Sequence, residues 1–353
     1  MQESNIKTAL ESAKNIGILT KNNANDDTIG AALALFFALR SSGKNVYFPT
    51  EDVSPKIQGF IRNRSSKKFK ISFEGEVSEV YYEKKDKGIA LYLTPKDKDA
   101  SDDKFSYKVI SGESPLSSNS NYDILFTLGI EEFGDVENLC KETADQLYSC
   151  TIINIDNNLN NQNYGEINMI KDNQSISQSV ACILKEIGQY QNEEADSFLL
   201  YGLSFSNKKS DNEKKVSTIR WLLKNGGKLN LFSRNSFKNN LLEIVLKNLV
   251  FENNVYISTI PEQSFTKNNA TSKDLSFVVD KLKNFLNLPT FFILWESRTS
   301  PLSVKGLFYS NKKHIQEKIN SNFKGAYKEK GGIFLTEENE LDIAKEKLLS
   351  FLN

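Results

Sequence analysis

The chain has 353 residues, of which 25% are charged and 39% hydrophobic, a composition typical of a globular protein of roughly two domains. Lys and Arg together number 45, as do Asp and Glu, and this balance argues against a general attraction to nucleic acid or to an anionic membrane. The three cysteines form no CxxC pair, which excludes a disulfide framework and a thiolate zinc site of the usual spacing.

The N-terminal segment alternates between predicted helices and strands. Residues 4–14 are predicted to form a helix, and NIGILT and KNVYFPT are predicted strands. Between these strands a helix is predicted from about Thr28 to Ser41, with Asp27 as its N-cap and Gly43 just past its end. The order strand, helix, strand predicts the start of a parallel α/β sheet.

Residues 51–120 depart from this alternation. The segments FKISFEG, SEVYYEKK, GIALYLT and FSYKVIS are rich in aromatic and β-branched residues, which is typical of strands. We therefore predict a β-rich insertion in the sheet domain. The α/β pattern then resumes with predicted strands at 122–129 and 150–156 and predicted helices at 135–147, 175–188 and 192–205.

A smaller α/β domain is predicted at the C-terminal end of the chain. Its predicted helices are at 236–250, 273–288, 312–320 and 338–352, and its predicted strands are at 254–260, 290–297, 303–310 and 332–336, the middle two forming an adjacent pair. The predicted organisation is a first domain over 1–206 with the 51–120 insertion, a linker and connecting helix over 207–228, and a second domain over 229–353.

The chain contains a single histidine, His314, in the polar segment SNKKHIQEKI, where an exposed helix is predicted. Mechanisms that need a His cluster, or a Ser-His or Cys-His pair, are therefore disfavoured. The N-terminal segment is polar and mixed in charge, unlike a signal peptide, and no apolar run is long enough to span a bilayer. We expect a cytoplasmic protein that does not enter a membrane.

Three predicted strands of the first domain end in polar turns. In a parallel α/β sheet, binding sites form just outside the carboxyl ends of the strands. We therefore expect these turns to share one crevice. Its expected members are Lys21, Asp26, Asp27, Gly129, Asp156, Asn157 and Asn158.

At these turns the chain resembles the DHH phosphoesterase superfamily, which includes oligoribonucleases and cyclic-dinucleotide phosphodiesterases. The family's first motif, roughly His-x-x-Pro-Asp-Gly-Asp-Ala-Ile-Gly-Ser, matches KNNANDDTIGA, which begins at Lys21. The naming motif Ile-Asp-His-His matches IDNN, which begins at Ile155. The family's second Asp falls at Gly129, and a fourth motif, Gly-Ile-x-x-Asp-Thr, matches GLSFSN with Ser206 at the Asp.

The resemblance implies a two-metal hydrolase site, usually of Mn²⁺, from which most ligands are missing. Asp27 and Asp156 keep their carboxylates, whereas Lys21 stands for a His and Asn25 for an Asp. The other replaced positions are Gly129, Asn157, Asn158 and Ser206. The C-terminal domain also lacks the family's Gly-Gly-His signature, with only FKGAYKEKGG nearby, and its substrate-binding Arg. We therefore expect a non-catalytic homologue that needs no cofactor.

Three functions stay open at this point. In the first, the chain binds a nucleotide, a short RNA or a protein partner in the interdomain cleft, and Lys21 replaces the metal as a point charge beside Asp27 or Asp156. The other cations expected to bind that ligand are Lys324, Lys328 and Lys330.

The second is a weak phosphodiesterase in which Asp27 and Asp156 hold one hard ion, Mg²⁺ or Mn²⁺. The third is a structural assembly subunit. Each residue also has a plainer interpretation: Asp27 as a helix cap, the turn that starts at Asp156 as an ordinary turn, and the basic FKGAYKEKGG segment as a solvated loop.

Overall fold

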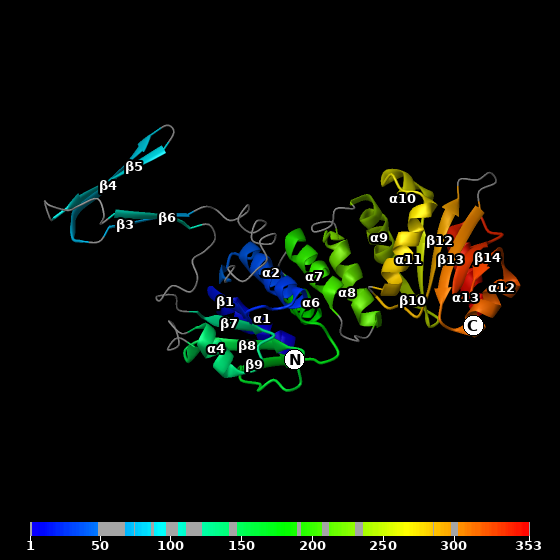
Figure 1. Ribbon diagram of the computed structural model, residues 1–353, viewed down its shortest axis with the longest axis horizontal. Coiled ribbons are helices and arrows are strands. Elements are labelled where there is room, and N and C mark those ends of the chain that lie inside the picture. The colour runs from blue at the N-terminus through cyan, green and yellow to red at the C-terminus, as the bar shows by residue number, and fades with distance from the viewer. Residues whose placement is uncertain are drawn as a thin grey trace. The chain divides into compact units, whose positions relative to one another are not determined.

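The computed structural model describes residues 2–48, 68–73, 75–85, 88–96, 105–110, 122–140, 147–188, 192–206, 212–229, 236–284, 286–297 and 303–352 (Figure 1). The chain divides into two compact units. One unit is Tyr47–Ser117, and the other joins Met1–Val46 to Ser118–Asn353. The domain boundaries expected at residues 206 and 229 stay predictions, and part of the expected linker, 207–211, lies outside the described residues.

The first sheet confirms the predicted α/β class with a parallel sheet. Its strand order is β2-β1-β7-β8-β9, and β1 with β7, β7 with β8, and β8 with β9 are parallel pairs. The strands are β1 (Asn15–Thr20), β2 (Asn45–Tyr47), β7 (Ile124–Leu128), β8 (Thr151–Asp156) and β9 (Ile167–Ile170). β9 is an addition to the predicted elements. Its short segment INMI follows a long polar turn, and its pairing with β8 is a tertiary contact.

The helices described with this sheet are α1 (Gln2–Ser12), α2 (Asp26–Ser41), α4 (Phe133–Leu139), α6 (Ile176–Ile187), α7 (Glu193–Phe205) and α8 (Asn212–Lys224). α2 is buried along most of its length because α6 and α7 pack against it. The small residues of α2 permit this packing. A Cβ on Gly30 would lie only 2.7 Å from the Phe198 carbonyl oxygen of α7.

Two predicted helix boundaries in this region were wrong. α2 begins at Asp26 with Asn25 as its N-cap, so the predicted cap, Asp27, is inside the first turn. α8 begins at Asn212, within NKKSDNEKK, the charged part of the 207–228 segment that was predicted to be a linker before the connecting helix. Residues 141–146 of the helix predicted at 135–147 lie outside the described residues.

The second sheet has the order β10-β11-β12-β13-β15-β14. Its strands are β10 (Val250–Glu252), β11 (Val255–Ile260), β12 (Thr290–Ser297), β13 (Ser303–Ser310), β14 (Lys324–Lys328) and β15 (Gly331–Leu335). β11 and β12 are parallel, and β12 and β13 form the predicted adjacent pair. The segment interpreted as a basic loop is instead the β14–β15 hairpin.

Helices pack on both faces of this sheet. They are α9 (Ser236–Asn248), α10 (Glu262–Lys267), the 3-10 helix η4 (Ser272–Asp274), α11 (Leu275–Asn284), α12 (Lys313–Asn322) and α13 (Leu341–Leu352). On the α12 and α13 face the core includes Phe292, Leu294, Phe308 and Phe334. The opposite face of β13 is half-buried, since alternate residues along this strand are buried and intermediate.

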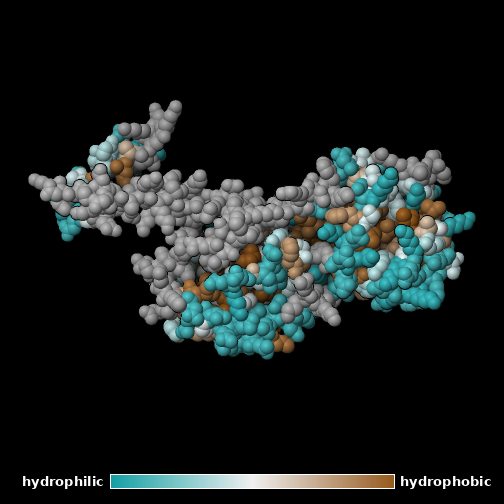
Figure 2. All heavy atoms as spheres, viewed as in Figure 1, coloured by the Kyte–Doolittle hydropathy of each residue, from teal (hydrophilic) through white to brown (hydrophobic). Residues whose placement is uncertain are grey.

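The Tyr47–Ser117 unit contains two antiparallel strand pairs, β3 (Lys68–Phe73) with β6 (Phe105–Ile110) and β4 (Val77–Lys85) with β5 (Gly88–Pro95). These are the four strands predicted for the β-rich insertion. Residues 51–67, 97–104 and 111–120 of the predicted insertion lie outside the described residues. On β4–β5, Val80 is 60% and Leu91 44% exposed, and hydrophobic spheres mark this hairpin in Figure 2.

Candidate functional site

The three polar turns meet at the carboxyl edge of the first sheet, as the parallel strand order predicts. The Gly129 N–H donates to the Ile155 carbonyl at 2.9 Å, which holds the turn after β7 against the end of β8. A Cβ on Gly129 would lie 3.4 Å from the Thr28 hydroxyl at the start of α2. Asp27, Gly129 and Asp156 therefore lie close together at this edge of the sheet.

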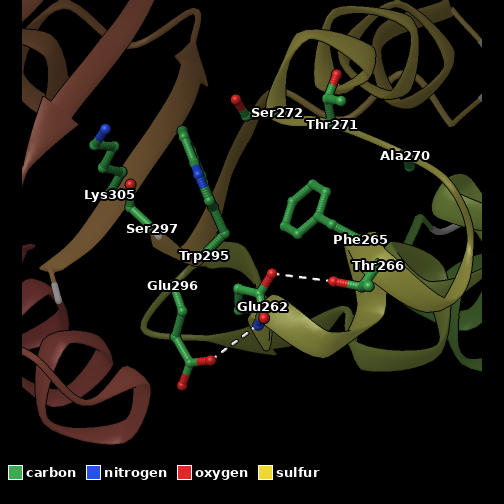
Figure 3. A pocket seen from close by; sticks show the side chains of 10 residues that line it. All are labelled: Glu262, Phe265, Thr266, Ala270, Thr271, Ser272, Trp295, Glu296, Ser297 and Lys305. Carbon is green, nitrogen blue, oxygen red and sulfur yellow. Dashed lines mark hydrogen bonds between the residues drawn. The ribbon is translucent and has the colours of Figure 1, made fainter. Parts of the chain in front are cut away.

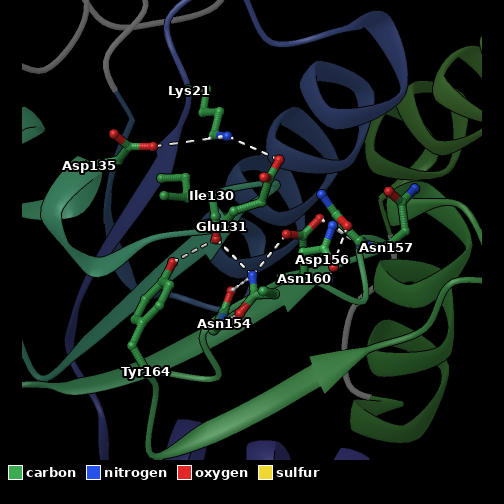
Figure 4. A network of polar contacts seen from close by, with 11 residues as sticks. Lys21, Ile130, Glu131, Asp135, Asn154, Asp156, Asn157, Asn160 and Tyr164 are labelled. Atoms are coloured by element: carbon green, nitrogen blue, oxygen red, sulfur yellow. Dashed lines mark hydrogen bonds and ion pairs between the residues drawn. The ribbon is translucent and has the colours of Figure 1, made fainter.

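Asp156 is 3% exposed and its carboxylate accepts hydrogen bonds from the chain's own donors (Figure 4). One oxygen accepts from the backbone N–H groups of Asn157 and Asn158, at 2.7 and 3.3 Å. The other oxygen accepts from the Asn161 side-chain amide at 2.8 Å. Both oxygens of this expected metal ligand thus face N–H donors.

Asn161 belongs to a buried amide network that sequence reasoning missed. Its amide also donates to the Ile130 carbonyl at 2.9 Å, and its side-chain oxygen accepts from Asn154 at 2.7 Å. The Tyr164 hydroxyl lies 3.1 Å from the same carbonyl (Figure 4). It also donates to the Thr127 hydroxyl at 2.8 Å. Asn154 carries the only sequence signal for this network, as a polar residue inside the otherwise buried apolar strand β8.

Asp27 is 5% exposed and binds the first turn of α6. Its two carboxylate oxygens accept from the backbone N–H groups of Ile176, at 2.9 Å, and Ser177, at 3.1 Å. Burial raises the pKa of the Asp27 carboxyl, while hydrogen bonds from Ser177 and Ile176 act to lower it. The interpretation of Asp27 as the N-cap of its own helix was wrong: Asn25 is that N-cap, and Asp27 instead accepts from the first turn of α6, whose own N-cap is Ser175.

The cation that interacts with Asp27 is Lys215 of α8, which is 5% exposed. Burial lowers the pKa of the Lys215 ammonium, and the charge of Asp27 acts in the opposite direction. Nothing in the sequence indicated this role, because Lys215 lies in a run of charged residues, NEKK, that resembles a solvated segment.

Lys21, which was expected beside Asp27 or Asp156, lies elsewhere. Its ammonium is 3.2 Å from Glu131 and 3.9 Å from Asp135, both in the segment after β7 (Figure 4). The hydrogen bond from Lys21, with a further one from Asn158, lowers the pKa of the Glu131 carboxyl. These acids were not recognised in the sequence because they belong to none of the family's motifs.

Other predicted site residues have structural partners at the same edge. The Asn25 side chain accepts from the Thr28 N–H at 2.9 Å, as an N-cap does. Asp26 is exposed and accepts a hydrogen bond from the Tyr201 hydroxyl. Burial raises the pKa of Tyr201, and the hydrogen bond to Asp26 raises it further. Ser206 is the residue that follows α7.

The predicted ligand-binding lysines of the C-terminal domain lie on the β14–β15 hairpin. Lys324 and Lys328 are exposed on β14, an edge strand, and Lys330 is exposed at the turn. Lys330 contributes its backbone carbonyl to a 2.9 Å hydrogen bond from Ser310. In the described part of the chain, none of the three ammonium groups forms an ion pair.

The residues at the sheet edge do not fit the metal pair that the resemblance implies. A metal pair needs several anionic ligands with free lone pairs, and N–H donors already occupy part of the lone pairs of Asp27 and Asp156. The ammonium of Lys215 adds a positive charge near Asp27. No cluster of three or more His, Cys, Asp or Glu suited to a metal ion occurs among the described residues.

The comparisons with known proteins found no matching family model and no matching curated protein. Among solved structures, an exopolyphosphatase-related protein from Bacteroides fragilis is 14% identical with a TM-score of 0.40, covering 99% of this chain and 95% of its own. A candidate family II inorganic pyrophosphatase from Methanococcus jannaschii is 12% identical with a TM-score of 0.33, covering 95% and 99%.

A third structure is RecJ from Thermus thermophilus in complex with Mn²⁺, which is 9% identical with a TM-score of 0.25 and covers 99% of this chain and 54% of its own. Similarities this weak establish neither a family nor an activity. None of the described helices is both long and apolar enough to cross a bilayer.

Proposed function

We propose that the chain is a DHH-superfamily phosphoesterase homologue that has lost its metal site and binds a nucleotide or short RNA without hydrolysing it. The order and spacing of the sequence motifs support the family. The meeting of Asp27, Gly129 and Asp156 at one edge of a parallel sheet supports it as well, because that is where a hydrolase of this architecture would place its ligands.

The hydrogen bonds to the two remaining carboxylates, Asp27 and Asp156, are the observation that best supports a loss of activity. Asp156 accepts from two backbone N–H groups and the Asn161 amide, and Asp27 accepts from two N–H groups of α6. Two-metal hydrolysis requires these oxygens to bridge or bind cations about 4 Å apart. Each carboxylate therefore has N–H donors on both oxygens, which leaves fewer lone pairs and less negative charge for a cation.

Exposed cations support the binding part of the proposal. Lys324 and Lys328 have no carboxylate partner in the described part of the chain, and an ammonium neutralises phosphate as a point charge without a metal. Lys21 is omitted from the proposed ligand contacts, because Glu131 and Asp135 already neutralise it.

A metal titration and a hydrolysis assay test the proposed loss of the metal site and of hydrolysis. Calorimetric titration with Mn²⁺ and Mg²⁺ should show no tight binding. The protein should then give no Mn²⁺-dependent hydrolysis of bis-p-nitrophenyl phosphate, short RNA or cyclic dinucleotides above a buffer control. Metal-dependent turnover that Asp156→Ala abolishes would contradict the proposal and support a weak phosphodiesterase.

A thermal-shift screen with nucleotides and short RNA tests the binding half. A ligand-induced rise in melting temperature should be reduced when Lys324 and Lys328 are both replaced by Gln, and it should fall with added salt. Lys313→Gln, at an exposed lysine of α12, is the matched control and should leave the shift unchanged. If no nucleotide or RNA raises the melting temperature, the proposed nucleotide or RNA binding is rejected, and a protein partner or a structural subunit is favoured.

A further inference from the structure

A pocket of about 420 Å³ lies in the C-terminal domain, beyond the carboxyl ends of the parallel strands β11 and β12 (Figure 3). This volume is within the range of small-molecule sites, and crevices outside the carboxyl ends of parallel strands commonly bind ligands. The pocket is built on the second sheet, so it is separate from the Asp156 network of the first.

Two aromatic side chains on opposite sides form the apolar part of the pocket. Trp295 comes from β12 and Phe265 from α10, and the two side chains point toward each other across the open space (Figure 3). They are 5% and 8% exposed, yet neither ring stacks on another ring within the described part of the chain. The exposed part of each ring lines the pocket, where a flat group would gain contact area against it.

The indole N–H of Trp295 has no hydrogen-bond partner among the described residues, and its nitrogen is not one of the buried atoms that lack a partner, so it is open to solvent in the pocket. This donor is part of the lining of the pocket, so a ligand acceptor would satisfy it.

Charge divides the pocket into two ends. Lys305 of β13 stands directly opposite Trp295 in the antiparallel register, so its side chain rises beside the indole ring. Its ammonium has no ion-pair partner in the described ranges. At the other end, Glu262 and Glu296 are tied to the start of α10: the Glu262 carboxylate accepts from Thr266 at 3.1 Å, and Glu296 accepts from the Glu262 N–H at 2.9 Å.

We propose that this pocket binds a flat aromatic anion, with its ring between Trp295 and Phe265 and its anionic group at Lys305. Glu262 and Glu296 at the far end would repel the anionic group, so they disfavour the reversed orientation of the ligand. A phosphate or a carboxylate on an aromatic ring would both satisfy this chemistry. The size of the slot suits a single nucleoside monophosphate or a smaller aromatic acid.

Tryptophan fluorescence provides a direct test, because the chain has two tryptophans. Trp221→Phe leaves Trp295 as the only reporter. This protein is titrated with adenosine 5′-monophosphate and with nicotinate, and in parallel with adenosine, which lacks the anion, and ribose 5-phosphate, which lacks the ring. Saturable quenching by the monophosphate assigns a phosphate ligand, and by nicotinate a carboxylate ligand. Absence of saturable quenching by both, or equal quenching by the ring-free or uncharged analogue, would overturn the proposal.

Variants then place the ligand within the pocket. In the Trp221→Phe protein, Lys305→Gln should weaken binding at least ~tenfold, equivalent to about 1.4 kcal/mol, and Lys305→Arg should retain it. Phe265→Leu should weaken binding of the ring. Lys313→Gln, at an exposed lysine of α12, and Lys21→Gln, just after β1, should leave the affinity unchanged. Equal losses in Lys305→Gln and Lys313→Gln would show a nonspecific charge effect. Urea melts of each variant confirm that it is folded.

Discussion

Asp27 and Ile176 are 149 positions apart in the chain, and the Ile176 N–H donates to the Asp27 carboxylate at 2.9 Å. This bond and its neighbour from Ser177 join the start of α2 to the start of α6. The carboxylate that was expected to bind a cation is here an acceptor for two orphan N–H groups of a helix N-terminus.

Removing this carboxylate should therefore destabilise the fold. In Asp27→Ala two buried N–H groups lose their acceptor, at about 1–3 kcal/mol for each unsatisfied group. In Asp27→Asn the loss should be smaller, because one amide oxygen remains. Urea melts at neutral pH measure both. Asp172→Asn, at an exposed acid in the turn before α6, is the control and should match wild type. An unchanged midpoint for Asp27→Ala would mean that the cap contributes nothing to stability.

Gly129 should tolerate no side chain. Its φ is +64°, in the left-handed region, and a Cβ there would lie 3.2 Å from the Ile176 Cδ1 atom. Gly129→Ala should lower the free energy of unfolding by about 1–2 kcal/mol from the backbone alone. Gly134→Ala is the matched control, because nothing lies within 4 Å of its Cβ position. Similar urea midpoints for the two variants would show that the turn relaxes freely.

Asn161→Asp tests the amide network at Asp156. The substitution places a second carboxylate where an amide now donates at 2.8 Å to Asp156. Two buried carboxylates at this distance repel, so one folded-state pKa rises above its unfolded value. The variant should be unstable at neutral pH, and the penalty should diminish as pH falls through that raised pKa. Asn160→Asp, an exposed neighbour, is the control. A pH-independent difference between Asn161→Asp and wild type would contradict the like-charge explanation.

The ion pair between Glu3 and Lys171, 2.8 Å long, predicts a pH dependence of the opposite sign. The hydrogen bond from Lys171 holds the pKa of Glu3 below its ordinary value of 4.5. A lowered folded-state pKa contributes stability above the unfolded pKa and loses it as pH falls through the folded value. Glu3→Gln should cost ~0.2–1 kcal/mol at neutral pH and nothing in acid. Glu11→Gln, on the exposed end of the same helix, should show no such trend in urea melts.

The amino-acid sequence by itself determined the local elements and their order. The segment NIGILTKNNANDD was sufficient to predict a strand that ends in a polar turn before a small-residue helix, because side-chain periodicity and turn chemistry act within a few residues. The parallel order of these elements also predicted that Asp27, Gly129 and Asp156 would meet at one edge. This prediction needs only the directions of the strands, which follow from the predicted order of strands and helices.

Only the tertiary structure decided which partner each polar group takes. The sequence NEKK does not distinguish the buried Lys215 from its solvated neighbours, and Lys21 was matched to Asp27 or Asp156 when Glu131 and Asp135 are its partners. Asn161 became the partner of Asp156, and Trp295 came to face Phe265, through contacts that no local pattern encodes. Burial and hydrogen-bond pairing depend on how elements that are distant in the sequence pack together. Several acceptors of the same chemical type are available to each donor, and the packing decides which of them lies within hydrogen-bond distance.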